Sequence, residues 1–181
     1  MSISNIDTSP VLETERLRLR RVTLADAKAI FFLRSDKDVG KYIARNPQIS
    51  VKEAEVFILD RQKDIESHKI SYWAITLKGN DTLIGSICLW NFTNNQTVAE
   101  LGYDLHPDFQ KKGIMNEALR LVLNFGFNTL KFHQIEAFTQ KQNQSSIALL
   151  NKNKFKQHPT RIDEGFPENI IFELQYSEYV K

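Results

Sequence analysis

Residues Gln110 to Glu117 read Q-K-K-G-I-M-N-E. They follow the extended segment A-E-L-G-Y-D-L-H-P, residues 99–107, after a gap of two residues. They open a strongly apolar segment whose hydrophobic residues recur at helical spacing, on a face wide enough to pack against a sheet. A strand that feeds a glycine-containing turn and then a helix presents free backbone N–H groups and the positive end of the helix dipole at one point. The stretch therefore predicts a strand, a turn and a helix that together bind a pyrophosphate.

Strand-like and helix-like segments alternate along the rest of the chain, which predicts a mixed α/β or α+β sheet covered by helices. The segment Lys78 to Asp81 predicts a hairpin, because Gly79 and Asn80 tolerate positive φ. A turn around residues 165–167 separates a final pair of strands. The other expected strands are 12–22, 72–77, 83–92, 97–105 and 132–139, the expected helices are 24–35, 50–67, 113–128 and 144–153, and a variable loop runs from Asp36 to Gln48.

The composition is typical of an ordinary globular protein. The chain has 181 residues, of which 41% are hydrophobic and 25% charged, with no repeat or linker-like stretch, so a single domain over residues 1–181 is expected. No apolar run approaches the roughly 20 residues of a membrane helix. The polar start through Pro10 lacks a signal-peptide core, and Cys88 is the single cysteine. These features predict a cytoplasmic protein that does not bind membranes.

The charge pattern argues against a dedicated nucleic-acid binder. The 24 basic and 22 acidic residues give a net charge of +2, without the large clustered excess such proteins usually show. The densest basic segment, Arg16 to Arg21, alternates with period two, which favours a strand with buried leucines and solvated arginines. RNA or ribosome binding through this segment is the disfavoured alternative. No metal is predicted, because the histidines lack metal-ligand spacing. They are His68, His106, His133 and His158.

A second segment, Asn143 to Phe155, reads N-Q-S-S-I-A-L-L-N-K-N-K-F. The Gln110 segment and this segment, in that order, resemble the two signature segments of the GCN5-related N-acetyltransferases (GNAT superfamily). The Gln110 segment resembles the acetyl-CoA loop of that family. The opening E-T-E-R-L-R-L-R (residues 13–20), the A-E-L-G-Y strand and the Asn-x-x-Ser spacing most resemble the branch containing RimJ and RimL, which acetylate the N-termini of ribosomal proteins. The resemblance covers the chain from about Leu12 to Tyr176.

The resemblance implies the α+β GNAT fold. This fold has a twisted, mostly antiparallel mixed sheet, flanked by about four helices and splayed between its fourth and fifth strands, here residues 97–105 and 132–139. Acetyl-CoA would lie in the gap, where backbone groups of Tyr103, Asp104 and Leu105 would pair with its pantetheine arm. The pyrophosphate would be held by the turn and the first helical residues. These are Gln110, Lys111, Lys112, Gly113, Ile114, Met115 and Asn116.

The resemblance also implies a catalytic base. Acetyl transfer from a thioester to an amine needs a neutral amine, and Glu100 is the candidate base, acting through a water. From the residues alone, the strand face of Glu100, Gly102 and Asp104 is predicted to be polar and solvated. Asp104 is the rival carboxylate on this face. A backbone N–H near Tyr103 or Leu105 is expected to meet the oxyanion.

Ser146 is the candidate that helps the thiolate to leave, by donating a hydrogen bond to the coenzyme A sulfur. The alternative for Ser146 and its neighbours is local helix capping, for which serine and asparagine are preferred. Asn143 is expected to cap the helix and touch the pantetheine arm at once. Ser145 is the neighbouring serine that has to be excluded as the leaving-group donor. Cys88 could accept an acetyl group, but its apolar surroundings favour a buried small hydrophobe.

Four residues depart from the family pattern. Lys111 stands where many relatives carry glycine, and Met115 stands where glycine or alanine is commonest. Close approach of the backbone to the pyrophosphate therefore depends mainly on Gly113. Lys154 replaces the usual glycine before Phe155. Leu150 occupies the position at which many superfamily members have a tyrosine general acid, so that tyrosine is missing from that position. The sequence does not say whether these changes weaken cofactor binding or catalysis.

The expected reaction is direct transfer of an acetyl group from acetyl-CoA to a primary amine. A protein N-terminal α-amine is the favoured acceptor, because its pKa of about 7.7 to 8.0 lies below the roughly 10.4 of lysine. The loop Asp36 to Gln48, Trp90 and Phe92 are expected to line the acceptor side. The alternatives are a small amine (polyamine, amino sugar or antibiotic) and a non-catalytic acyl-CoA-binding module. The sequence leaves the oligomeric state open, with a homodimer as one option.

Overall fold

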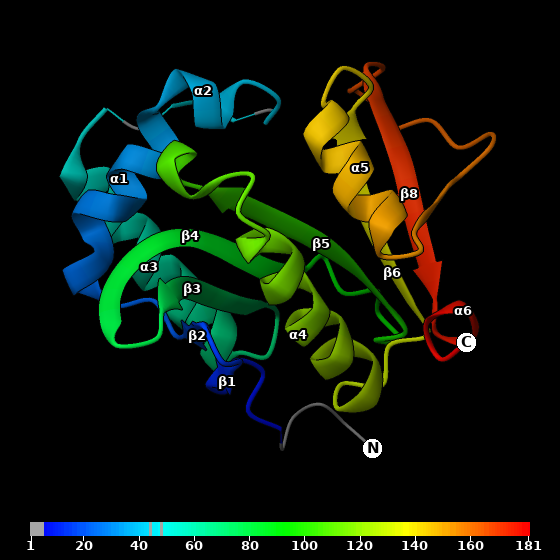
Figure 1. Ribbon diagram of the computed structural model, residues 1–181, viewed down its shortest axis with the longest axis horizontal. Helices are drawn as coiled ribbons and strands as arrows, with labels where there is room; N and C mark the ends of the chain where they lie inside the picture. Colours follow the sequence, from blue (N-terminus) through cyan, green and yellow to red (C-terminus); the bar gives the residue numbers. More distant parts are fainter. Residues whose placement is uncertain (1–5, 44, 48) are drawn as a thin grey trace.

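The computed structural model describes residues 6–43, 45–47 and 49–181, and its strands form one eight-stranded sheet (Figure 1). The strand order is β1-β2-β3-β4-β5-β6-β8-β7, and every neighbouring pair is antiparallel except β5 and β6. The predicted mostly antiparallel mixed sheet is therefore confirmed. The strands are β1 (Leu12–Glu13), β2 (Leu17–Arg20), β3 (Ser71–Leu77), β4 (Asn80–Trp90), β5 (Val98–Leu105), β6 (Gln134–Gln140), β7 (Lys156–Gln157) and β8 (Asn169–Gln175).

Helices cover both faces of the sheet. Alternation along β3 separates two cores: Trp73 and Ile75 pack in the core that contains α4, whereas Tyr72 and Ala74 pack in the core that contains α1 and α3. Leu150 of α5 belongs to the α4 core. The helices are α1 (Ala27–Ser35), α2 (Lys37–Gly40), α3 (Val51–Glu66), α4 (Ile114–Asn128), α5 (Gln144–Lys152) and α6 (Tyr176–Tyr179), with 3-10 turns η2 (Leu24–Asp26) and η3 (Pro107–Phe109).

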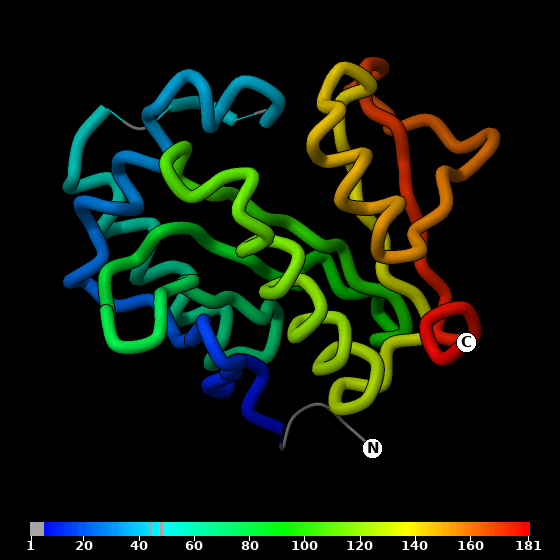
Figure 2. Tube along the Cα trace, viewed as in Figure 1, coloured from blue at the N-terminus to red at the C-terminus, as the bar shows by residue number. Residues whose placement is uncertain are grey.

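The parallel pair β5 and β6 opens the sheet. The two strands are in register only from Val98 with Gln134 to Leu101 with Ala137. Beyond this point β6 continues beside β8, while β5 continues beside β4 to Leu105. In Figure 2 the chain through β6, α5 and β8 stands apart from β5 and α2 at this end of the molecule. The predicted splay is confirmed. It lies between β5 and β6 because the first expected strand is in fact two strands.

That first strand, expected over residues 12–22, is an antiparallel hairpin of β1 and β2. The hydroxyl oxygen of Thr14 accepts hydrogen bonds from the backbone N–H groups of Arg16 (3.2 Å) and Leu17 (2.9 Å), which reverses the chain. Thr14 and Arg16 also donate hydrogen bonds to the carboxylate of Glu117 in α4. A local side-chain turn therefore interrupted a pattern that reads as one continuous strand.

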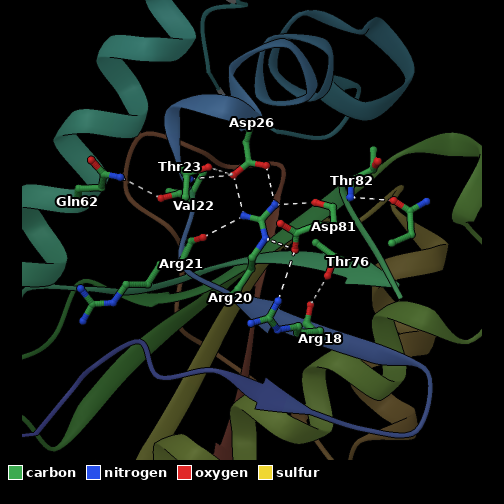
Figure 3. A network of polar contacts seen from close by, with 11 residues as sticks. Arg18, Arg20, Arg21, Val22, Thr23, Asp26, Gln62, Thr76, Asp81 and Thr82 are labelled. Carbon is green, nitrogen blue, oxygen red and sulfur yellow. Dashed lines mark hydrogen bonds and ion pairs between the residues drawn. The ribbon is translucent and has the colours of Figure 1, made fainter. Parts of the chain in front are cut away.

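The arginines of β2 are not all solvated, as had been expected. The Arg20 side chain is only 11% exposed and forms a paired contact with Asp26, at 2.8 Å to each carboxylate oxygen (Figure 3). It also bonds the carboxylate of Asp81 in β4 and the backbone oxygens of Asp81 and Arg21. The hydrogen bonds to Asp26 raise the pKa of Arg20 further above its usual value. The prediction holds for Arg18, whose side chain is 44% exposed.

Two turns differ in detail from the sequence predictions. Gly79 has the expected positive φ of 84° in the β3–β4 hairpin, but Asn80 does not and instead begins β4. The variable loop from Asp36 contains the short helix α2, and its positions 44 and 48 lie outside the described residues. Within the described part of the chain, no helix is long and apolar enough to cross a membrane.

Candidate active site

A cavity of about 500 Å³ lies where β5 and β6 separate. Its walls come from the end of β5, the turn into α4 and the first residues of α4, one face of α5 and residues 38–43 around α2. Ten of the eleven residues predicted to hold the cofactor line it. They are Tyr103, Asp104, Leu105, Gln110, Lys111, Gly113, Ile114, Met115, Asn116 and Asn143. Lys112 is the eleventh, and its ammonium group lies 5.7 Å from the centre of the Phe109 ring.

The turn into α4 adopts the conformation that its glycine allows. Gly113 precedes α4 with φ of 77°, and Lys111 has φ of 59°. A Cβ atom at Gly113 would meet nothing closer than Arg16 Nη2 at 3.8 Å, so backbone conformation rather than lack of space favours glycine here. The first N–H groups of α4 have no partner inside the helix, and a helix N-terminus of this kind favours a bound anion. The amide of Gln110 donates to the Leu105 carbonyl (3.0 Å) and braces the turn against β5.

The departures from the family pattern are accommodated by the fold. Lys111 and Lys154 both take positive φ, of 59° and 65°, so each lysine adopts the backbone conformation that glycine would supply. Met115 is buried where α4 meets the cavity, and Leu150 is fully buried in the core. Burial of Leu150 explains why no polar group stands at that position of α5.

A tyrosine hydroxyl nevertheless reaches the site, from β5. Tyr103 Oη lies 2.7 Å from Ser146 Oγ, and both residues line the cavity. Burial raises the pKa of Tyr103 to about 12, so this hydroxyl stays protonated at neutral pH. The prediction for Tyr103 concerned only its backbone, and its hydroxyl was missed because the partner is 43 residues away in sequence. The signal available was a tyrosine on the same strand face as Leu101 and Leu105, the face that α4 covers.

Asn143 caps α5, as predicted. Its side-chain oxygen accepts a hydrogen bond from the backbone N–H of Ser146 at 3.2 Å. Ser146 itself is buried and uses its hydroxyl for Tyr103, whereas Ser145 is exposed. The cap therefore fixes the first turn of α5, and that turn holds the Ser146 hydroxyl at the cavity wall.

Glu100 lies where the gap begins to open. It is half-buried in β5, with Trp90 of β4 and Glu136 of β6 as its cross-strand neighbours. Burial raises the pKa of Glu100 to about 7, and the negative charges of Asp163 and Glu136 add to the rise, against a 3.4 Å hydrogen bond from Asn91. A carboxylate with this pKa can accept a proton near neutral pH. Glu100 does not line the 500 Å³ cavity.

The rival carboxylate, Asp104, is already engaged. Its side chain is 9% exposed, and it accepts a hydrogen bond from Ser86 Oγ (2.7 Å) and pairs with Arg45 (3.2 Å). The predicted solvated face is therefore wrong at Asp104, because α1 and the loop after α2 cover this end of β5. A carboxylate fixed by two partners is less available as a base than Glu100.

The remaining candidates, Cys88, Phe92 and Trp90, differ in burial and in their neighbours. Burial raises the pKa of the Cys88 thiol to about 12, which leaves little thiolate to accept an acetyl group. Phe92 packs against Phe132 with ring centres 5.0 Å apart, whereas Trp90 is 41% exposed beside Glu100. Among the residues that the structure describes, no three His, Cys, Asp or Glu side chains are arranged to hold a metal ion.

Comparison with known proteins gives one consistent result. The family model described as an acetyltransferase (GNAT) domain matches residues 16–156. The uncharacterized N-acetyltransferase p20 of Bacillus licheniformis is 34% identical over 147 residues, which make up 80% of this chain and 82% of the relative.

Two solved structures share the fold. The ribosomal-protein-S5-alanine acetyltransferase from Vibrio fischeri has a TM-score of 0.81 at 18% identity, covering 94% of this chain and 99% of that one. The spermidine N-acetyltransferase from Vibrio cholerae, in complex with CoA and spermine, has a TM-score of 0.79 at 20% identity, covering 93% and 100%. At such identities the two structures support the fold alone.

Proposed function

The chain belongs to the GNAT acetyltransferase domain family and is an N-acetyltransferase, and we propose that it moves the acetyl group of acetyl-CoA to the N-terminal α-amine of a protein or peptide. The observation that carries this proposal is the arrangement at the β5–β6 gap. Two hydroxyls, of Tyr103 and Ser146, stand at the cavity wall, and the half-buried carboxylate of Glu100 stands where the gap opens.

The residues that line the cavity support acetyl-CoA as its ligand. Past Leu101, β5 has no strand partner on the β6 side within the described residues. Apart from the Leu105 carbonyl, which accepts the Gln110 amide, the backbone groups of residues 102–105 on that side could pair with the pantetheine amides. The left-handed Gly113 leads into the N-terminus of α4, where the pyrophosphate would bind. Lys111 and Gln110 line the same part of the cavity. Acetyl-CoA, once bound, supplies the activated thioester.

Glu100 is the proposed base. It takes a proton from the acceptor amine, directly or through a water, as the amine nitrogen forms its bond to the acetyl carbon. Its pKa of about 7 suits an α-amine, whose pKa of about 7.7 to 8.0 is far closer than that of lysine. A backbone N–H of β5 near Tyr103 or Leu105 would donate to the oxyanion, because such a donor is already oriented.

Ser146 and Tyr103 are proposed to assist the leaving group. As the carbon–sulfur bond breaks, the Ser146 hydroxyl donates a hydrogen bond to the sulfur. The Tyr103 hydroxyl donates a hydrogen bond to Ser146 Oγ and so orients the serine. A charge-assisted hydrogen bond to a developing anion contributes about 1.5 to 3 kcal/mol. The thiolate then takes a proton from water and becomes the thiol of coenzyme A, and Glu100 releases to water the proton that it removed, so the protons balance.

The acceptor has to be tested directly, since relatives with this fold are named for both acceptor types. One is a ribosomal-protein-S5-alanine acetyltransferase and another a spermidine N-acetyltransferase. We expect mass spectrometry to find acetylated peptide N-termini when peptides, polyamines and amino sugars are incubated with the enzyme and acetyl-CoA. Acetylation of only the polyamines or amino sugars would refute the proposed acceptor.

A further inference from the structure

Three arginines from separate elements gather beside the Asp104 end of β5. Arg34 lies in the last turn of α1, Arg45 in the loop after α2 and Arg61 in α3. The guanidinium carbons of Arg34 and Arg61 lie 4.0 Å and 5.1 Å from the centre of the same ring, that of Phe57. Arg45 pairs with Asp104 at 3.2 Å. We call Arg34, Arg45 and Arg61 the arginine cluster.

The charge of the arginine cluster is not balanced. Arg45 has Asp104 as its partner, and Arg61 has Asp64 at 2.8 Å. Arg34 has no hydrogen-bond acceptor and no ion-pair partner among residues 6–43, 45–47 and 49–181. Burial lowers the pKa of Arg34, and the nearby charge of Arg45 lowers it further, whereas Tyr72 and the negative charge of Asp104 act in the opposite direction with smaller effect. One cation is therefore left over at a partly buried position.

The cluster also has unused hydrogen-bond donors. The Nε atoms of Arg34, Arg45 and Arg61 are all buried and have no partner in the described chain. Buried donors without an acceptor cost free energy, and a guanidinium presents its donors in a fork that matches a carboxylate. Arg34 as a whole is only partly buried, so a carboxylate bound at its accessible atoms would supply the missing charge.

The cluster lies at a reachable distance from the proposed base. Glu100 and Asp104 are four residues apart on the same face of β5, which corresponds to about 13 Å at the usual strand rise. Gly102 lies between them, and a Cβ atom there would come within 3.1 Å of Cys88 Sγ. Gly102 therefore adds no side chain of its own between Glu100 and the arginine cluster, where the Cys88 and Trp90 side chains border the strand.

We propose that the arginine cluster, with Arg34 as its principal member, binds a carboxylate of the acceptor, so that the preferred acceptor is an acidic peptide. This inference rests on the proposed function, because it assumes that the acceptor amine is at Glu100. An extended chain spans about 3.3 to 3.6 Å per residue, so an acidic side chain at the third or fourth residue reaches the cluster. A polyamine would meet uncompensated positive charge there.

Three amidated peptides that differ only at residues three and four test the proposal. These two residues are both Asp, both Asn or both Lys, and kcat/KM is measured with acetyl-CoA. We expect the Asp peptide to exceed the Asn peptide by about tenfold or more, and the Lys peptide to be the poorest. Arg34→Met should bring the Asp/Asn ratio close to one, because the guanidinium over Phe57 and its charge are lost while an unbranched side chain of similar length is kept. Arg34→Lys should retain part of the preference.

Arg18→Met is the matched control. Arg18 is a half-exposed arginine of β2, outside the cluster and the cavity, so its loss should leave the Asp/Asn ratio unchanged. A second measurement needs no turnover: N-acetylated forms of the three peptides are titrated into the enzyme with coenzyme A by calorimetry. The Asp form should bind about tenfold more tightly than the Asn form.

The outcomes separate the two proposals. If the peptides are acetylated but Asp and Asn peptides react and bind equally, or if Arg34→Met lowers all three rates alike, the arginine cluster is not an acceptor site and the proposed function stands. If no peptide is acetylated while spermidine is, the proposed acceptor falls and the acidic preference falls with it.

Discussion

At the scale of single residues, two carboxylates, of Glu136 and Asp163, lie near Glu100 and raise its pKa. Glu136, the cross-strand neighbour of Glu100 in β6, accepts hydrogen bonds from both terminal nitrogens of Arg161. Arg161 therefore offsets a negative charge that would otherwise act fully on Glu100. Asp163 adds a further negative charge.

We predict that Arg161→Met shifts the rise of kcat/KM with pH to higher pH. Loss of the cation leaves Glu136 unneutralised, which disfavours ionised Glu100, and the base must be ionised to act. The pH–rate profile with a peptide acceptor measures the shift, and Arg161→Lys should restore part of it. An unchanged profile with a uniformly lower rate would show that Arg161 matters only for local structure.

We predict that Ser146→Ala lowers kcat by about tenfold or more, and that adding Tyr103→Phe costs little beyond this. The two hydroxyls act as one unit if Tyr103 only orients Ser146, so their effects should not add. Steady-state kinetics of both single variants and the double variant measure the coupling. Fully additive losses would contradict the proposed relay.

Sequence reasoning could find some of these residues and not others. Ser146, Asn143 and Glu100 stand at motif positions, and the resemblance indicated them. The strand pattern placed Tyr103 on the apolar face of β5, but neither the partner of its hydroxyl nor the arginine cluster could be found, because these contacts form only when α1, α3, α5 and β5 pack. A period-two pattern also assigns residues to faces without saying what covers them, which is why Asp104 was expected to be solvated.

At the scale of elements, the two lysines at glycine positions retain the turn geometry of glycine. Lys111 precedes α4 and Lys154 follows α5, each with positive φ. A non-glycine residue in this region costs roughly 1 to 2 kcal/mol. The sequence shows the substitution but cannot show that the backbone conformation persists, because the surrounding hydrogen bonds impose it.

We predict that Lys154→Gly stabilises the fold by about 0.5 to 1 kcal/mol, since relief of the backbone strain exceeds the entropy that glycine adds to the unfolded chain. A melting temperature about 1 to 4 °C higher would report this. Lys152→Gly, at the end of α5, is the control and should be destabilising instead. Equal losses in both variants would mean that Lys154 is not strained.

The strand predictions failed at the N-terminal end of the sheet, where local side-chain hydrogen bonds again decide the backbone conformation. The strand expected over residues 12–22 splits because the Thr14 side chain supplies a local turn. The longer elements were found from their hydrophobic periodicity, and α3, β5 and α4 agree with the expected bounds to within a residue. Side-chain turns leave no comparable period in the sequence.

At the scale of the whole molecule, Arg20 links three parts of the α1-side layer. It joins β2 to Asp26 before α1 and to Asp81 at the start of β4 (Figure 3). Asp26 also accepts hydrogen bonds from the backbone and hydroxyl of Thr23. The turn that leads into α1 is thereby tied to strands β2 and β4.

We predict that Asp26→Ala lowers the free energy of unfolding by about 3 to 5 kcal/mol, because it leaves the mostly buried Arg20 without its main partner. Urea denaturation measures this, with an unchanged m-value expected. Arg21→Ala is the control: its pair with Asp7 is about half-exposed, so the cost should stay within about 1 kcal/mol. Similar losses in both would contradict a special role for the Arg20 pair.

The most direct test of the central claim is the pH dependence of acetyl transfer to a peptide N-terminus by the wild-type enzyme and Glu100→Gln, followed by intact mass and thiol release. Wild-type kcat/KM should rise with pH through an apparent pKa of about 7, since Glu100 must lose its proton to act. Glu100→Gln should lose about 10²-fold or more in kcat while acetyl-CoA still raises its melting temperature. A Glu100→Gln enzyme with wild-type kcat and the same pH profile would contradict the account.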